Sequence, residues 1–128
     1  MEIVGYNGNT LAYVGDAVMS LQVRNYLVSE RNLQKPNMLQ KESIKFVSAK
    51  AQAKFLIKMQ EDGVLNDEEE RIVKRGRNAK SDSVAKNVDI NTYRIATGLE
   101  ALWGYLYLTK KMERLEVLWQ YILKIAEV

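Results

Sequence analysis

The stretch Leu11-Ala12-Tyr13-Val14-Gly15-Asp16-Ala17-Val18-Met19 places a carboxylate inside an apolar run. Its apolar residues recur every three or four positions, which predicts a helix from about Thr10 to Val28, with Thr10 as its cap. A second apolar run, Leu99 to Leu108, surrounds Glu100 in the same way. Because an ionised carboxylate among apolar groups needs a cation or hydrogen bonds, we expect each acid to face a cation.

The composition of the chain excludes several kinds of site. Histidine and cysteine are both absent, which rules out disulfides, zinc held by these side chains, and Ser-His or Cys-His nucleophile pairs. An enzyme of this composition must use carboxylates, lysines, tyrosines or a hard metal ion. A length of 128 residues and a hydrophobic content of 47% suit one globular domain, residues 1–128. With no leader pattern and no apolar stretch of the ~18 residues that span a membrane, we expect a cytoplasmic protein.

Helical spacing of apolar residues continues along the rest of the chain. Gly63 is predicted to end a helix in the left-handed conformation, and Asn66 or Asp67 to cap the next helix. No strand-like alternation is present, so the sequence predicts an all-α helical bundle. The helices predicted after the first cover about residues 38–60, with a break near Ser43, then 67–76, 92–108 and 113–127.

Small residues flank both acids at helical spacing. Asp16 shares a face with Ala12 and Ser20, and the face of Glu100 contains Thr97, Ala101 and Gly104. We expect these small neighbours to leave room for a metal ion and its waters, and Gly15 and Gly98 to allow close backbone approach. Carboxylates and water suit Mg²⁺, which can generate a nucleophilic hydroxide without histidine. The alternative is structural: Asp16 as a helix cap, Glu100 as an exposed helix acid, and the small residues as packing contacts.

Several motifs together resemble the endonuclease domain of the ribonuclease III family. The run around Asp16 resembles the signature helix of the family, and the run around Glu100 resembles its second catalytic helix. Supporting segments follow in the order of the family at residues 35–37, 47–53, 68–70, 74–81 and 92–94. The resemblance is closest to the short bacterial form, Mini-ribonuclease III, because Ala12 and Thr97 stand where the longer enzymes have two further acids.

The resemblance implies a ribonuclease III fold and an enzyme that hydrolyses double-stranded RNA. It implies that Asp16 and Glu100 are catalytic and hold Mg²⁺, with Mn²⁺ as a substitute, and that the products carry 5′-phosphate and 3′-hydroxyl ends. It further implies a homodimer that matures the ends of 23S ribosomal RNA precursors, and it leaves open whether a ribosomal protein assists. Because the short form lacks a double-stranded-RNA-binding domain, we expect the catalytic domain to hold the duplex itself.

A basic segment, Lys74 to Lys86, is the predicted RNA-binding surface. It contains five basic residues and one acid, and a solvated helix end is the alternative explanation. Gly76 is expected to let the backbone approach a phosphate. Lys50 and Arg94 are further candidates, although either can instead form an internal ion pair. The expected RNA contacts come from Lys74, Arg75, Arg77, Asn78, Lys80, Ser81 and Lys86.

Large side chains near both acids have two interpretations, as core residues or as contacts with a second subunit. They are Met19, Val23, Tyr26, Trp103, Tyr105 and Tyr107. Two other functions are also compatible with the sequence: a non-catalytic RNA-binding module on the same fold, and a helical protein–protein adaptor. Retention of both acids argues against the module, and the adaptor leaves the basic segment unexplained.

Overall fold

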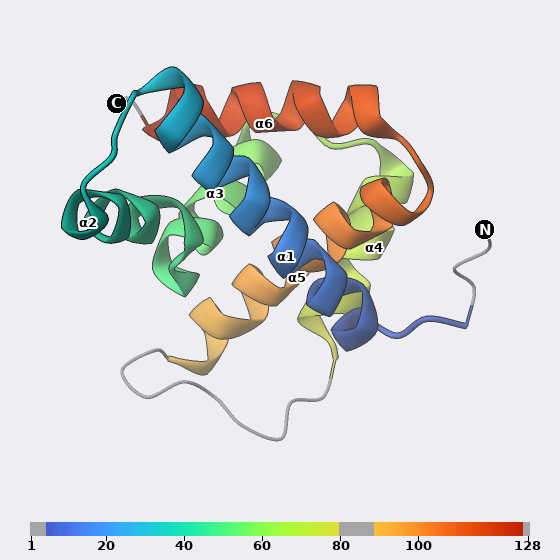
Figure 1. Cartoon of the computed structure of the whole chain (residues 1–128). Helices are drawn as coiled ribbons and strands as arrows, with labels where there is room; N and C mark the ends of the chain where they lie inside the picture. Colours follow the sequence, from blue (N-terminus) through green and yellow to red (C-terminus); the bar gives the residue numbers. More distant parts are fainter. Residues whose placement is uncertain (1–4, 80–88, 127–128) are drawn as a thin grey trace.

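A computed structural model describes residues 5–79 and 89–126, and this part of the chain is helical with no strand. The all-α fold predicted from the sequence is confirmed (Figure 1). None of the described helices is long and apolar enough to cross a membrane. The elements are α1 (Gly8–Asn25), the π-helical segment η1 (Tyr26–Glu30), α2 (Pro36–Val47), α3 (Ala49–Glu61), α4 (Asp67–Arg77), α5 (Ile90–Leu108) and α6 (Met112–Ala126).

The central element of the fold is α5, on which α1, α3, α4 and α6 all pack (Figure 1). Eleven of its 19 residues are buried, and Leu99, Leu102 and Leu106 are fully buried. A helix that is apolar on all sides is stable only inside a protein, which explains the long apolar run in this part of the sequence. Glu100 is therefore carried by the helix at the centre of the molecule.

Two glycines let α1 and α5 cross with their backbones in contact. A Cβ atom on Gly15 would lie 1.7 Å from the carbonyl oxygen of Glu100, and one on Gly104 would lie 1.9 Å from the carbonyl oxygen of Leu11. Both distances are far below van der Waals contact, so only glycine fits at either position. The crossing places Asp16, the neighbour of Gly15 in the sequence, next to Glu100.

Two helix starts differ from the sequence predictions. The cap of α1 is Asn7, whose side-chain oxygen accepts from the backbone N–H of Thr10 at 2.8 Å, so the prediction of Thr10 as the cap is wrong. The break predicted near Ser43 falls at Ser48, and that prediction is also wrong. The hydroxyl of Ser48 caps α3 by accepting from the backbone N–H of Ala51 at 3.1 Å.

The corner between α3 and α4 follows the sequence prediction. Gly63 has a φ of +64°, the left-handed conformation expected after a helix end. Asn66 caps α4 in a reciprocal pair with Glu69: each side chain accepts from the backbone N–H of the other residue, at 2.8 Å and 2.9 Å. Arg114 of α6 donates to both carboxylate oxygens of the buried Glu69 at 2.8 Å, which ties α6 to this corner.

Candidate active site

Asp16 and Glu100 form a carboxylate pair where α1 crosses α5. Their side chains are hydrogen-bonded to each other, so the structure brings the two predicted acids together. Glu100 is half-buried, whereas Asp16 is exposed to solvent at the edge of a mainly apolar hollow. Asp16 lies well inside α1, at the edge of its buried face, so it does not cap a helix.

The charge state of this pair decides what it can bind. Burial, followed by the hydrogen bond to Asp16 and the negative charge of Asp16, raises the pKa of Glu100 from 4.5 to about 8. Without a bound cation, Glu100 therefore holds its proton at neutral pH. No lysine or arginine among the described residues lowers the pKa of Glu100. A divalent cation would relieve the repulsion and take the place of the proton.

Gln52 of α3 is a third member of the site that sequence reasoning missed. Its side chain is almost fully buried, and its amide donates to the sulfur of Met19 at 3.5 Å. The same side chain is hydrogen-bonded to Glu100 and acts to lower the pKa of that carboxyl, which requires the amide N–H to donate. A glutamine on the apolar face of a helix, aligned with Leu56 and Met59, was the available signal in the sequence.

The small residues on α5 do not make room for a metal ion. Leu11 of α1 fills the space beside Gly104, and Ala101 is fully buried. Gly98 packs against Val73 of α4, as the prediction of close approach required. The hydroxyl of Thr97 donates to the carbonyl oxygen of Tyr93 at 2.9 Å, inside its own helix. The small residues on α5 are therefore packing contacts, as the structural alternative stated. The side of the carboxylate pair that is open to solvent is the side of Asp16.

The donor set of the site suits a hard divalent cation. Asp16 and Glu100 supply carboxylate oxygens, and within the described residues no third acid joins them to make a larger cluster. Mg²⁺ prefers oxygen ligands, keeps several of its waters, and commonly takes only one or two protein carboxylates. The pair therefore fits Mg²⁺ better than a cation that needs a closed protein cage.

Part of the predicted RNA surface lines one hollow, here called the α4–α5 hollow. Lys74, Arg77 and Asn78, at the end of α4, share it with Asn91 and Arg94, at the start of α5. Arg94 thus joins the predicted residues of α4, and it forms no ion pair with any described residue. Glu70, which accepts from Gln60 at 3.0 Å, also lines the hollow, so three basic side chains face one acid there, and the net positive charge suits a phosphate-binding surface.

Other residues of the predicted RNA surface lie elsewhere. Arg75 donates to the backbone carbonyl of Tyr6 at 3.1 Å, next to α1. Gly76 is buried between α1 and α5, so the prediction that it approaches a phosphate is wrong. Lys50 is exposed, lines a separate hollow of α2, α3 and α6, and has no ion pair with a described residue. Lys80, Ser81 and Lys86 lie outside the described residues.

Most of the large side chains near the acids belong to the core. Trp103, Tyr105, Met19 and Val23 are all buried, and Tyr26 packs edge-on against Phe46 and Trp119. Tyr107 alone in this group is exposed. The exposed apolar residues near Asp16 are different ones, chiefly Tyr13, Leu21 and Met112. The core interpretation therefore holds for the buried members, and within this group Tyr107 has the exposed surface that a contact with a second subunit requires.

Comparison with known proteins gives consistent matches over most of the chain. Residues 9–111 match the Ribonuclease III domain family. A Mini-ribonuclease 3 of Enterococcus faecalis is 52% identical over 118 residues, which cover 92% of this chain and 89% of the relative. One of Staphylococcus aureus is 50% identical over 120 residues, covering 94% and 89%. An X-ray structure of a Fusobacterium nucleatum protein, 32% identical, has a TM-score of 0.83 and covers 95% of both chains.

These matches extend from the signature helix to α6, so they do not depend on one motif. The ribonuclease III family acts on double-stranded RNA and is generally dependent on a divalent metal ion. A carboxylate pair that no lysine or arginine of the described residues neutralises is consistent with that chemistry. The chain therefore belongs to the ribonuclease III family, within its Mini-ribonuclease 3 group, and is an endoribonuclease.

Proposed function

We propose that the protein hydrolyses phosphodiester bonds of double-stranded RNA at the Asp16–Glu100 pair, with Mg²⁺ bound and Mn²⁺ as a substitute. Held by Asp16 and Glu100, the ion would activate a water molecule as the nucleophile and stabilise charge on the phosphoryl group. A water oxygen bonds to phosphorus while the bond to the 3′ oxygen breaks, which leaves 5′-phosphate and 3′-hydroxyl ends. The observation that carries this proposal is the contact between two acids that no described cation neutralises.

The two acids and Gln52 have different parts in this reaction. Asp16 is exposed and would bind the ion on the side from which RNA approaches. Glu100 would bind it from the protein side, with its carboxylate oriented by the amide of Gln52. Outer groups of this kind fix the geometry of ligands and commonly change metal affinity. Waters and phosphate oxygens would complete the coordination of the ion.

Duplex RNA would bind across the α4–α5 hollow. A-form RNA is recognised mainly through its phosphates and 2′-hydroxyls. Lys74 and Arg77 are exposed and would contact phosphates, and Asn78, Asn91 and Arg94 would donate to phosphate or ribose oxygens. We assign the same role to Lys80, Ser81 and Lys86 on the basis of their residue types and their place in the basic segment.

An apolar surface on α1 supports assembly as a homodimer. Tyr13 and Leu21 are 83% and 70% exposed, and they line one hollow together with Tyr107 and Met112. Contiguous exposed apolar surface of this kind marks interaction sites. Asp16 lines the same hollow, so a second copy seated there would bring two carboxylate pairs close together, one for each strand of a duplex.

The cellular substrate that we infer is the precursor of 23S ribosomal RNA. This inference rests on the resemblance to Mini-ribonuclease III. Mapping the cut sites on naked precursor and on precursor carrying ribosomal proteins would test it. Cuts at the mature ends in either sample support the inference, and a difference between the samples identifies a need for a helper. Cuts at unrelated duplexes only would overturn it.

One assay tests the proposed activity against the two alternatives. The purified protein is incubated with duplex RNA and Mg²⁺, beside an Asp16→Asn variant and a sample with a chelator. Cleavage by the parent alone supports the enzyme. Binding without cleavage would support a non-catalytic module, and no binding would support an adaptor.

Analytical ultracentrifugation of the parent and of Leu21→Asp tests the dimer: a parent of monomer mass would overturn it.

A further inference from the structure

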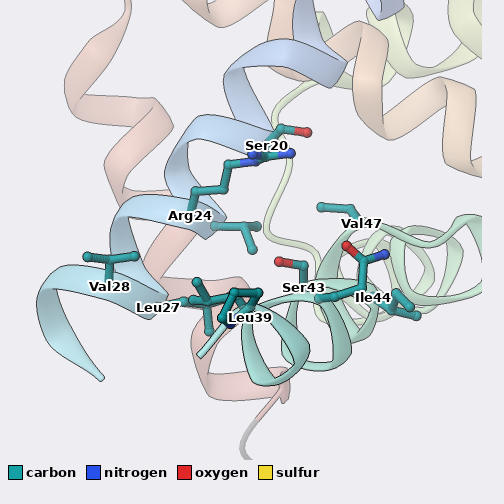
Figure 2. Close-up of a pocket in the computed structure, with 11 residues that line it drawn as sticks. Ser20, Arg24, Leu27, Val28, Leu39, Ser43, Ile44 and Val47 are labelled. Carbon is teal, nitrogen blue, oxygen red and sulfur yellow. The ribbon is translucent and has the colours of Figure 1, made fainter. Parts of the chain in front are cut away.

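Another hollow, here called the α1–α2 groove, lies between α1 and α2 (Figure 2). Its volume is about 500 Å³. Figure 2 shows Ser20 and Arg24 on α1 facing Ser43 and Val47 on α2 across the groove, with the guanidinium of Arg24 directed along the helix toward Ser20. The function proposed above assigns no role to this groove.

The groove carries uncompensated positive charge. None of the residues that line it is acidic, and Arg24 is exposed and forms no ion pair with any residue in the ranges 5–79 and 89–126. Ser20 and Ser43 are half-buried and add hydroxyl groups to its two walls. An arginine with hydroxyl donors near it matches the geometry of a phosphate group.

Residues of the groove and Asp16 lie along the same face of α1. Asp16, Ser20 and Arg24 follow one another at four-residue intervals, so they lie on one face of the helix. At 1.5 Å per residue, the Cα of Arg24 lies about 12 Å along the axis from that of Asp16, and its side chain shortens the gap by turning back toward Ser20. An RNA strand that reaches Asp16 can therefore extend into the groove.

We propose that the α1–α2 groove binds the sugar–phosphate backbone of the strand that is cut, at a phosphate near the scissile one but distinct from it. Arg24 binds that phosphate, and Ser20 and Ser43 donate to it or to the adjoining ribose. Apolar walls formed by residues such as Val47 pack against the ribose. This inference rests on the function proposed above, because it requires RNA at Asp16.

Binding measurements provide the first test. In an Asp16→Asn background that cannot cleave, Arg24→Ala should weaken duplex RNA binding about tenfold and make the salt dependence shallower by about one unit of slope. Arg24→Lys should restore part of the loss, because lysine keeps the charge and loses the planar fork. Lys124→Ala is the matched control, since this exposed lysine of α6 lines none of the four hollows described above and its loss changes the net charge equally.

A phosphate-by-phosphate scan locates the contact. Duplexes are prepared with an uncharged methylphosphonate at one position at a time in the cleaved strand, and the affinity of each is measured. The parent should lose affinity at several positions, and Arg24→Ala should become insensitive at one of them while it keeps the others. Arg77→Ala should become insensitive at a different position. An Arg24→Ala profile identical to that of the parent would overturn the proposal.

The same experiments separate failure of this inference from failure of the proposed function. If the parent cleaves duplex RNA and Arg24→Ala keeps its affinity, its salt slope and every position of the scan, then the function stands and the groove does not bind RNA. If the parent neither binds nor cleaves duplex RNA, the proposed function is wrong. The proposal that the groove binds RNA is then wrong as well.

Discussion

The carbonyl oxygen of Glu100 lies directly against the Cα of Gly15, at the point where α5 crosses α1. A methyl group on Gly15 would sit 1.7 Å from that oxygen. Gly15 precedes Asp16, and Glu100 is the partner of Asp16. One backbone contact therefore sets the separation of the two acids.

Gly15→Ala should destabilise the protein by about 3 kcal/mol or more, because neither backbone at the crossing can yield to the added methyl group. It should also abolish cleavage by moving the acids apart. Chemical denaturation and the duplex cleavage assay measure the two effects. Gly5→Ala is the control, since a Cβ there meets nothing within 4 Å. If both variants unfold at the same denaturant concentration, the crossing is looser than described.

The stability of the metal-free protein should fall as the pH rises. The pKa of Glu100 is raised from 4.5 to about 8, so the folded state holds this proton more tightly than the unfolded state does. The resulting stability is fully present below pH 4.5 and is lost as the pH rises through about 8. We expect the melting temperature to fall from about pH 6 to about pH 8.5, and Mg²⁺ to restore more of it at the higher pH.

Glu100→Gln is the control for this pH dependence, because it has no carboxyl to titrate. Its melting temperature should respond less to pH over the same range and less to Mg²⁺. A metal-free parent with the same pH profile as Glu100→Gln would show that the pKa of Glu100 is not raised.

Removing the amide of Gln52 should weaken metal binding more than it weakens the fold. Gln52→Leu keeps most of the side-chain volume but deprives Glu100 of its donor. We expect the Mg²⁺ concentration for half-maximal cleavage to rise about tenfold or more. Gln120→Leu, on α6, is the control, since Gln120 instead donates to Glu116 at 2.9 Å. Equal Mg²⁺ requirements in the two variants would remove Gln52 from the site.

Arg77→Ala should weaken duplex RNA binding similarly for all sequences and make the salt dependence shallower by about one unit, as expected for the loss of one phosphate contact. Arg77 is exposed and lines the α4–α5 hollow. Titrations at several salt concentrations measure the slope, with Lys124→Ala again as the control. An unchanged slope in Arg77→Ala would place the RNA surface elsewhere.

An acid-sensitive ion cluster away from the site gives an independent prediction. Hydrogen bonds from Lys45 and Arg31, both 2.7 Å long, lower the pKa of Glu42 from 4.5 to about 2. The stability from this cluster is therefore present above pH 4.5 and is lost as the pH falls toward 2. Glu42→Gln should flatten acid denaturation across that window, and Glu61→Gln should not. Parallel acid titrations of both variants and the parent would decide this.

The fold class could be predicted because it depends on local sequence, and the resemblance to a known family predicted that Asp16 and Glu100 lie together. Asn66 and Gly63 act on the residues next to them, so their cap and turn are visible in a short stretch. An acid inside an apolar run marks itself in the same way, and the resemblance to ribonuclease III then joins Asp16 to Glu100. Local reasoning failed where two local choices compete, as with Asn7 and Thr10 at the start of α1.

Contacts between helices were harder to predict, since periodicity does not say what an apolar face meets. The helix α5 is apolar on all sides, so the sequence could not tell that Gly104 receives the backbone of α1 and leaves no space for a metal ion. For the same reason, Trp103 and Tyr107 looked alike, although one is fully buried and the other is 47% exposed. Gln52 was missed because its partner lies on another helix.

The contact between the main chains of α1 and α5 has a consequence for how the sequence of such an enzyme can evolve. Side-chain packing adjusts when core residues are exchanged, but a peptide backbone has a fixed thickness. Residues such as Leu99 and Leu102 can therefore be replaced by other apolar residues while the two acids keep their spacing. The geometry of the peptide unit therefore sets the spacing of Asp16 and Glu100, and the side chains of the surrounding core do not.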